Sequence, residues 1–99
     1  PKVLASILSA STGRNWALEV CNPHPDVGDA MPSSRGYTGG FMSKLMLKDM
    51  NLAKQTANDT GVVTPMADQA TALYTQHSEA HGDKDFSSIM AHYDAEVLS

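Results

Sequence analysis

Two lysines that stand four residues apart mark the polar side of the stretch from residue 39 to residue 61. At that spacing Lys44 and Lys48 share one face of a helix, in a stripe that also holds Phe41, Leu52 and Gln55. Like charges at i and i+4 repel by a few tenths of a kcal/mol, so helix stability does not favour the pair. The pattern fits either a face that binds an anion from outside or a solvated cationic face. Asp49 follows Lys48 but lies about 100° further round the helix, so it need not pair with it.

Two histidines, His77 and His81, lie at i and i+4 of a predicted helix and share one face, as metal ligands often do. The zinc-protease pattern, however, places a glutamate directly after the first histidine. Here Glu79 comes one residue late and points off that face. We therefore interpret the pair as a solvated helix end.

A second set of polar residues falls in a loop, and it consists of His24, Asp26 and Asp29. Its spacing does not match the alternating oxygen ligands of a calcium loop, so we expect turn-capping roles. The single Cys21 has no partner for a disulfide, zinc or redox motif. The sequence therefore predicts no metal site and gives no support for a nucleophilic mechanism.

The lysine face belongs to a predicted helix from Phe41 to Thr60, whose apolar side would face a core. Gly61 fits the left-handed position that ends many helices. Thr64 and Pro65 suit the cap and first position of a following helix, which ends at His81. The predicted core of the two helices comprises Leu45, Met46, Met50, Leu52, Ala53, Ala57, Met66, Ala70, Leu73 and Tyr74.

The flanking segments are predicted as helices 1–10 and 15–21, a long loop 22–40, and a last helix that begins near Asp85, with Asp83 or Asp85 as its cap. The loop holds four of the seven glycines and three of the five prolines, and we expect it to wrap a neighbouring domain or subunit. The expected core contributions are Trp16 from the second helix, and Phe86, Ile89, Met90 and Tyr93 from the last one. No strand signal is longer than a few residues. The fold class is therefore predicted to be all-α.

Bulk properties limit the alternatives. A chain of 99 residues with 41% hydrophobic residues can form one domain or part of one. The net charge of −4, without a basic cluster, argues against nucleic-acid binding. The apolar runs are far shorter than the roughly 18 residues that a membrane span needs.

Several motifs together resemble the C-terminal domain of the β-hydroxyacid dehydrogenases. They are Gly40-Phe41, the block from Lys48 to Ala53, Thr64-Pro65 and Asp85-Phe86-Ser87, preceded by residues 11–16 and Asn22-Pro23. The resemblance covers essentially the whole chain. It implies a helical domain of the 6-phosphogluconate dehydrogenase C-terminal-like type, present only in part. Met50-Asn51 replaces the usual Leu-Gly of the family block.

The resemblance implies NAD(P)-dependent oxidation of a 3-hydroxy acid, such as 3-hydroxyisobutyrate, to its semialdehyde. Related substrates such as glycerate, tartronate semialdehyde, serine and 4-hydroxybutyrate stay open, because most of the residues that discriminate among them fall outside residues 1–99. NAD is the expected cofactor, with NADP possible. By the same resemblance Lys48 contacts the cofactor, whereas Phe41 and Asp49 belong to the substrate pocket and Lys44 is solvated. The family's catalytic lysine and its Rossmann domain fall outside residues 1–99, so no catalytic residue is expected here.

The expected partners are the chain's own N-terminal Rossmann domain and further copies of itself, in a dimer or tetramer. A helix that opens at residue 1 with no cap before it indicates a piece of a longer protein. We therefore expect exposed apolar surface on this piece and no enzymatic activity of the piece alone. The expected location of the protein is the cytoplasm or, in a eukaryote, the mitochondrial matrix. The alternative is a free-standing helical binding or dimerisation module without catalysis.

Overall fold

Helices account for all the regular secondary structure in the computed structural model, which describes residues 1–99. The four α-helices are α1 (Lys2–Ser9), α2 (Trp16–Val20), α3 (Ser43–Thr60) and α4 (Pro65–His81). Three short 3₁₀ helices complete the chain: η1 (Pro32–Arg35), η2 (Phe86–His92) and η3 (Ala95–Leu98). The prediction of an all-α fold is confirmed. The predicted helix boundaries hold to within two residues.

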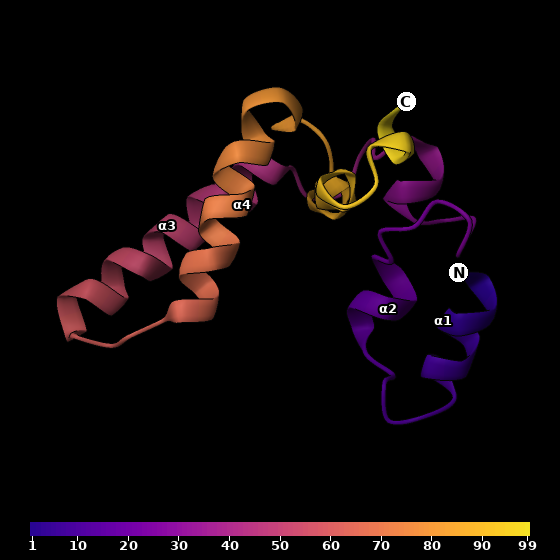
Figure 1. Cartoon of the computed structure of the whole chain (residues 1–99), viewed down its shortest axis with the longest axis horizontal. Coiled ribbons are helices and arrows are strands. Elements are labelled where there is room, and N and C mark those ends of the chain that lie inside the picture. Colours follow the sequence, from indigo (N-terminus) through magenta and orange to yellow (C-terminus); the bar gives the residue numbers. More distant parts are fainter.

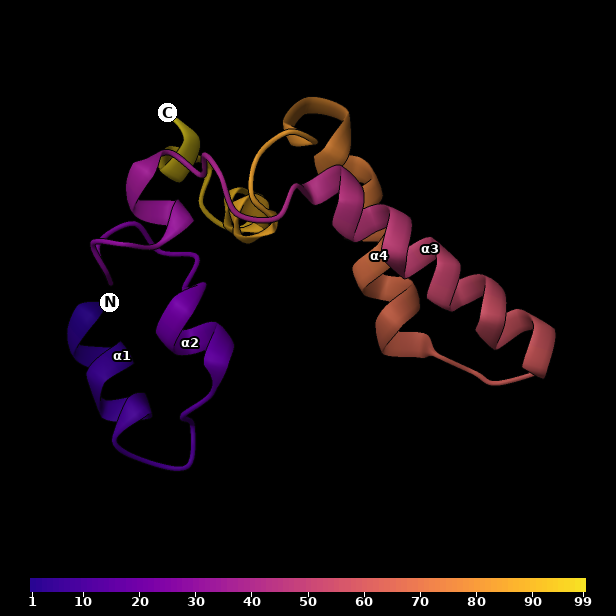
Figure 2. The ribbon, with the colours of Figure 1, turned by 180° about the vertical axis from the view of Figure 1, so that it is seen from behind.

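The helices form two groups at opposite ends of an elongated molecule with extents of 43 × 33 × 20 Å. In both views α3 and α4 lie side by side as an antiparallel hairpin, whereas α1 and α2 form a smaller pair at the other end (Figures 1 and 2). The segment that leads into α3 and the 3₁₀ helix η2 lie between the two groups, whereas η3 lies above the α1–α2 pair at the C-terminus (Figure 1). The start of α3 is therefore at the middle of the molecule, next to the C-terminal segment.

The start of α3 depends on the backbone of a distant segment, because the preceding residue, Met42, supplies no side-chain cap. The amide of Ser43 donates to the carbonyl of Lys84 at 2.8 Å, and the amide of Lys44 donates to Gly82 at 3.0 Å. These bonds satisfy two of the four amides that a helix leaves free at its N-terminus. The segment 82–84 thus fixes where the lysine-bearing helix begins.

The end of α3 follows the sequence prediction. Gly61 adopts φ +72°, and the amide of Val62 donates to the carbonyl of Ala57 at 2.9 Å. This is the left-handed glycine ending that closes the last helical turn. Thr64 then occupies the cap position of α4 and Pro65 the first turn, although the Thr64 side chain makes no capping hydrogen bond.

One face of α4 is held against η2 by hydrogen bonds. The hydroxyl of Tyr74 donates to the carbonyl of Phe86 at 2.8 Å, and His77 bonds Ser88 one turn later. Burial, with a smaller effect from the Asp85 charge, raises the pKa of Tyr74 to about 12. The phenol therefore stays protonated and available as the donor throughout the neutral pH range.

The long loop packs on its own chain. Tyr37 is fully buried, and its hydroxyl donates to the carbonyl of Pro23 at 2.7 Å. The carbonyl of Tyr37 accepts the amide of Asp85 at 2.9 Å, and the ammonium of Lys84 donates to the carbonyl of Gly36 at 2.9 Å. The loop therefore closes against the segment that leads into η2. Its contact with another domain or subunit stays a prediction.

Much of the predicted core is exposed. The core prediction is wrong for Trp16, Met66 and Tyr93, which are 65%, 84% and 73% exposed. It is also wrong for Leu45, Leu52 and Ala53, which are exposed on α3. It is confirmed for Ala57 and Tyr74, and Met46 and Met50 are half-buried. Only 12 of the 99 residues are buried, because α1, α2 and the outer face of the hairpin have few neighbours in this chain. None of the helices combines the length and the apolar character that a membrane-spanning helix requires.

Candidate functional site

The predicted site residues gather at the N-terminal half of α3 and immediately before it. Lys48 forms an ion pair with Asp49, with 3.0 Å between Nζ and Oδ1, and both side chains are more than half exposed. The sequence leaves open whether the two residues pair, and they do, because a flexible lysine side chain reaches its neighbour in sequence. Exposed pairs of this kind stabilise a protein by only about 0–1 kcal/mol, so Lys48 can exchange Asp49 for another anion at little cost.

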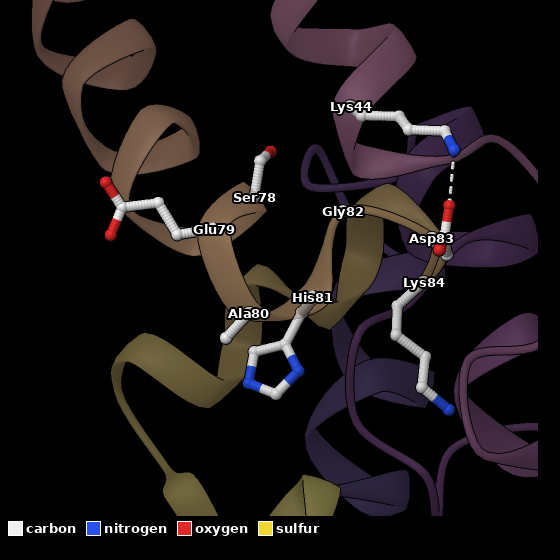
Figure 3. Close-up of a pocket in the computed structure, with 8 residues that line it drawn as sticks. All are labelled: Lys44, Ser78, Glu79, Ala80, His81, Gly82, Asp83 and Lys84. Atoms are coloured by element: carbon white, nitrogen blue, oxygen red, sulfur yellow. Dashed lines mark hydrogen bonds and ion pairs between the residues drawn. The ribbon is translucent and has the colours of Figure 1, made fainter.

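Lys44 differs from the sequence expectation because it is not simply solvated. Its ammonium forms an ion pair with Asp83, which follows α4 (Figure 3). Both side chains remain more than half exposed. Lys44 and Lys48 thus have separate acidic partners, and the repulsion expected between the two ammonium groups is relieved within the chain.

Phe41 lies just before α3 and is held from two sides. Its carbonyl accepts the amide of Phe86 at 2.7 Å, and its own amide donates to Asp85 Oδ1 at 2.7 Å. The two phenyl rings meet edge to face, with centroids 6.5 Å apart, a favoured aromatic geometry. Phe41 is 36% exposed, so its fixed ring presents an aromatic surface to solvent or to a neighbouring segment.

Asp85 makes a long-range hydrogen bond to Phe41 that the sequence did not predict. Its predicted role as a helix cap is confirmed, since Oδ2 accepts the amide of Ser87 at 3.0 Å. The bond from Oδ1 to Phe41, however, spans 44 residues and lies outside any local pattern. A sequence signal for it exists in Gly40, where a Cβ atom would lie 2.2 Å from Asp85 Oδ1. Only a glycine lets the chain pass this close to the carboxylate.

A polar pocket of about 330 Å³ lies beside the start of α3. It is lined by Lys44, Ser78, Glu79, Ala80, His81, Gly82, Asp83 and Lys84 (Figure 3). Figure 3 shows the Lys44–Asp83 pair at one side of it, with the Glu79 carboxylate turned away from the lysines. Phe41, Lys48 and Asp49 line none of the pockets in the structure. The predicted site residues therefore form an exposed face and not a closed cavity within this chain.

The interpretation of His77 and His81 as a solvated helix end is wrong for His77. That side chain is buried, and its Nε2 lies 2.7 Å from Ser88 Oγ. Burial lowers the pKa of His77, and the neighbouring His81 and His92 lower it further. No group of three or more His, Cys, Asp and Glu side chains lies where it could hold a metal ion. In the long loop, His24 Nδ1 accepts the amide of Asp26 at 3.2 Å, which is a turn role.

Comparison with known proteins gives consistent matches. Residues 1–93 match the sequence profile of the family described as the NAD-binding domain of NADP-dependent 3-hydroxyisobutyrate dehydrogenase. The NAD-dependent L-serine dehydrogenase of Pseudomonas aeruginosa is 45% identical over 94 residues, covering 94% of this chain and 32% of that protein. The 3-hydroxyisobutyrate dehydrogenase of the same organism is 42% identical over 96 residues, with the same coverage. The mitochondrial enzyme of Rattus norvegicus is 42% identical over 90 residues, covering 90% of this chain and 27% of that protein.

The fold is shared with a solved structure. The 3-hydroxyisobutyrate dehydrogenase of Mycobacterium tuberculosis, whose structure is described with L-serine, superimposes with a TM-score of 0.89 at 28% identity. The superposition covers 94% of this chain and 32% of that protein. This chain thus spans about a third of the length of the relatives it matches.

Fold and sequence together define a class, the all-helical C-terminal domains of the NAD(P)-dependent β-hydroxyacid dehydrogenases. Within that class, the chain belongs to the 3-hydroxyisobutyrate dehydrogenase family and corresponds to its C-terminal NAD-binding domain. The resemblance inferred from Gly40-Phe41, the Lys48–Ala53 block and Asp85-Phe86-Ser87 is confirmed at the level of the family.

Proposed function

We propose that this chain is the later part of the C-terminal domain of an NAD(P)-dependent dehydrogenase that oxidises 3-hydroxyisobutyrate to its semialdehyde. The observation that carries the proposal is the family match over residues 1–93, which includes every predicted site residue. The chain acts together with an N-terminal Rossmann domain and a catalytic-lysine helix, and it is inactive alone. Its part is to close the active site. By the same resemblance the enzyme works in the cytoplasm, or in the mitochondrial matrix of a eukaryote.

The cofactor contact is assigned to Lys48. Its ammonium projects from the exposed face of α3 and is held only by the weak pair with Asp49. When bound, NAD⁺ or NADP⁺ accepts a hydride from the carbinol carbon of the substrate. Lys48 contributes a positive charge that fixes the position of the dinucleotide through a charge-assisted hydrogen bond. Lys54 provides a control for substitutions of Lys48, because it lies on the same helix and forms an ion pair with Asp68 of α4, with 3.3 Å between Nζ and Oδ1.

The substrate side of the site is assigned to Phe41 and Asp49. The Phe41 ring, fixed by its edge contact with Phe86, forms an apolar wall that keeps water away from the reacting carbon. Asp49 is the acid nearest to Lys48 and, in the assembled enzyme, helps to orient and tune the catalytic amine. Both roles require the site to be completed by the other parts of the enzyme, because these side chains line no pocket here.

The exposed apolar side chains support a subunit or domain interface. On α1 they are Val3, Leu4 and Ile7, all more than half exposed, and Trp16 and Val20 add to them on α2. Apolar patches of this kind on a small domain mark surfaces that other protein segments cover. We assign this surface to contacts with the rest of the enzyme and with its second copy in a dimer or tetramer.

L-serine is a second candidate substrate. It is favoured by the 45% identity to an L-serine dehydrogenase and by the fold match to a structure described with L-serine. L-serine and 3-hydroxyisobutyrate are both short carboxylic acids with a primary hydroxyl group at the third carbon. They differ at the second carbon, where an ammonium group replaces a methyl group.

The test is a turnover assay of the full-length protein that carries this chain. Formation of NADH or NADPH is followed with 3-hydroxyisobutyrate and with L-serine, each with both cofactors. We expect the highest kcat/KM with 3-hydroxyisobutyrate and NAD⁺. A higher value with L-serine selects the second candidate. No reduction of NAD⁺ or NADP⁺ with either acid overturns both candidate substrates.

A further inference from the structure

Asp85 is a buried carboxylate without a cationic partner. Its side chain is 1% exposed, and the four ion pairs of the structure all involve other acids. Burying an unpaired carboxylate is costly unless hydrogen-bond donors surround it. Three donors do so: the amide of Phe41 at 2.7 Å, and the amide and hydroxyl of Ser87 at 3.0 and 2.5 Å. The carboxylate is therefore built into the structure at a specific place.

Helix capping explains only half of these contacts. The cap of η2 uses one carboxylate oxygen, Oδ2, for Ser87. The other oxygen, Oδ1, accepts the amide of Phe41, which precedes α3 in the sequence, whereas Asp85 follows α4. Asp94 provides a comparison within the chain, since it caps η3 by accepting the amide of Glu96 at 3.1 Å and bonds no distant segment. Asp85 thus makes a long-range contact that its capping role does not require.

The backbone around Phe41 is shaped to receive this carboxylate. Gly40 takes φ +71°, and a Cβ atom there would lie 2.2 Å from Oδ1 and 2.9 Å from Cγ of Asp85. Phe86 holds Phe41 in two further ways: its amide donates to the carbonyl of Phe41, and its ring contacts the Phe41 ring edge to face. The Phe41 residue is therefore fixed at its amide, its carbonyl and its ring, all by the segment 85–86.

We propose that Asp85 is a positioning residue of the dehydrogenase site, which acts through Phe41. Its carboxylate sets the backbone position of Phe41, and the Phe41 ring in turn sets the wall against which the hydroxy acid is oriented. The proposal rests on the proposed function, namely on the placement of Phe41 in the substrate pocket. Small displacements of substrate-orienting groups lower turnover strongly, because the reacting atoms must be close and aligned.

The test compares Asp85→Asn with Asp94→Asn in the full-length enzyme. An amide at position 85 offers one acceptor oxygen, so either the Phe41 amide or the Ser87 amide loses its partner. We expect Asp85→Asn to raise KM for the hydroxy acid and to lower kcat/KM by about 10- to 100-fold. The affinity for NAD⁺, measured by fluorescence titration, is expected to stay unchanged. Asp94→Asn removes the charge of a cap of the same type and is expected to leave both quantities unchanged.

A double-mutant cycle with Phe41→Leu separates a positioning role from a general loss of stability. If Asp85 acts through Phe41, Asp85→Asn has little further effect on kcat/KM once Phe41 is replaced. If Asp85→Asn does not fold, Ser87→Ala replaces it. This variant keeps the Asp85 charge but removes the hydrogen bond from the Ser87 hydroxyl to the carboxylate. We expect it to lower kcat/KM by a smaller factor than Asp85→Asn. Additive effects, or an Asp85→Asn enzyme with unchanged KM, overturn the inference while the effect of Phe41→Leu stands. An unchanged KM in Phe41→Leu overturns the placement of Phe41 and the inference with it.

Discussion

Replacing Gly40 by alanine tests the close approach of the chain to the Asp85 carboxylate. A non-glycine residue in the left-handed region costs about 1–2 kcal/mol, and Gly40 has φ +71°. The new methyl group would also lie 2.2 Å from Asp85 Oδ1, so the carboxylate must move away from the Phe41 amide. Losing a hydrogen bond to a charged group costs about 1.5–3 kcal/mol. Gly40→Ala is therefore expected to lower the free energy of unfolding by roughly 2.5–5 kcal/mol.

Two other glycines provide controls with the same backbone conformation. Gly39 and Gly61 both have φ +72°, but a Cβ atom at Gly39 meets nothing closer than 3.5 Å, and one at Gly61 meets nothing within 4 Å. Gly39→Ala and Gly61→Ala should each cost only about 1–2 kcal/mol. Urea denaturation followed by far-ultraviolet circular dichroism measures all three. A Gly40→Ala protein that is no less stable than the two controls would refute the reasoning about Asp85.

Two further predictions concern His77 and the exposed apolar surface. Because burial, His81 and His92 lower the pKa of His77 in the folded state, the unfolded chain binds more protons than the folded one just below the ordinary histidine pKa of about 6.5. The free energy of unfolding should therefore be highest above about pH 6.5 and fall as the pH drops towards the lowered pKa of His77 in the folded state. Urea denaturation at several pH values measures this slope, and His77→Gln should flatten it. Since Val3, Leu4 and Ile7 are exposed together on α1, the isolated chain is expected to associate, or to bind the rest of the enzyme. Sedimentation velocity checks this, and a monomer at all concentrations would contradict it.

The helices of this protein could be predicted from the sequence because their signals are local. Apolar spacing predicts α3 and α4, Gly61 marks the end of one and Pro65 the start of the other, and Asp85 is one of the two caps expected for the last helix. Each of these features depends on residues within about one helical turn of each other. The family motifs are equally local, so the family was also accessible from the sequence.

Burial and long-range contacts could not be predicted in the same way. Trp16, Met66 and Tyr93 have the residue types of a core, but whether a side chain is covered depends on which segments pack over it. The bond between Phe41 and Asp85 joins residues that are 44 positions apart, and helical periodicity carries no information at that distance. The burial of His77 against Ser88 depends on the same tertiary packing of η2 on α4.

The assignment of Lys48 to the cofactor is tested most directly by the affinity of the full-length enzyme for NAD⁺. Lys48→Ala removes one charge-assisted hydrogen bond, and it is expected to raise Kd by about 10- to 100-fold. Lys54→Ala removes a lysine of the same helix that pairs with Asp68 and has no role assigned at the cofactor, so it should leave Kd unchanged. Isothermal titration calorimetry measures both variants beside the unmodified enzyme. An affinity for NAD⁺ that is the same in Lys48→Ala and Lys54→Ala would contradict the account.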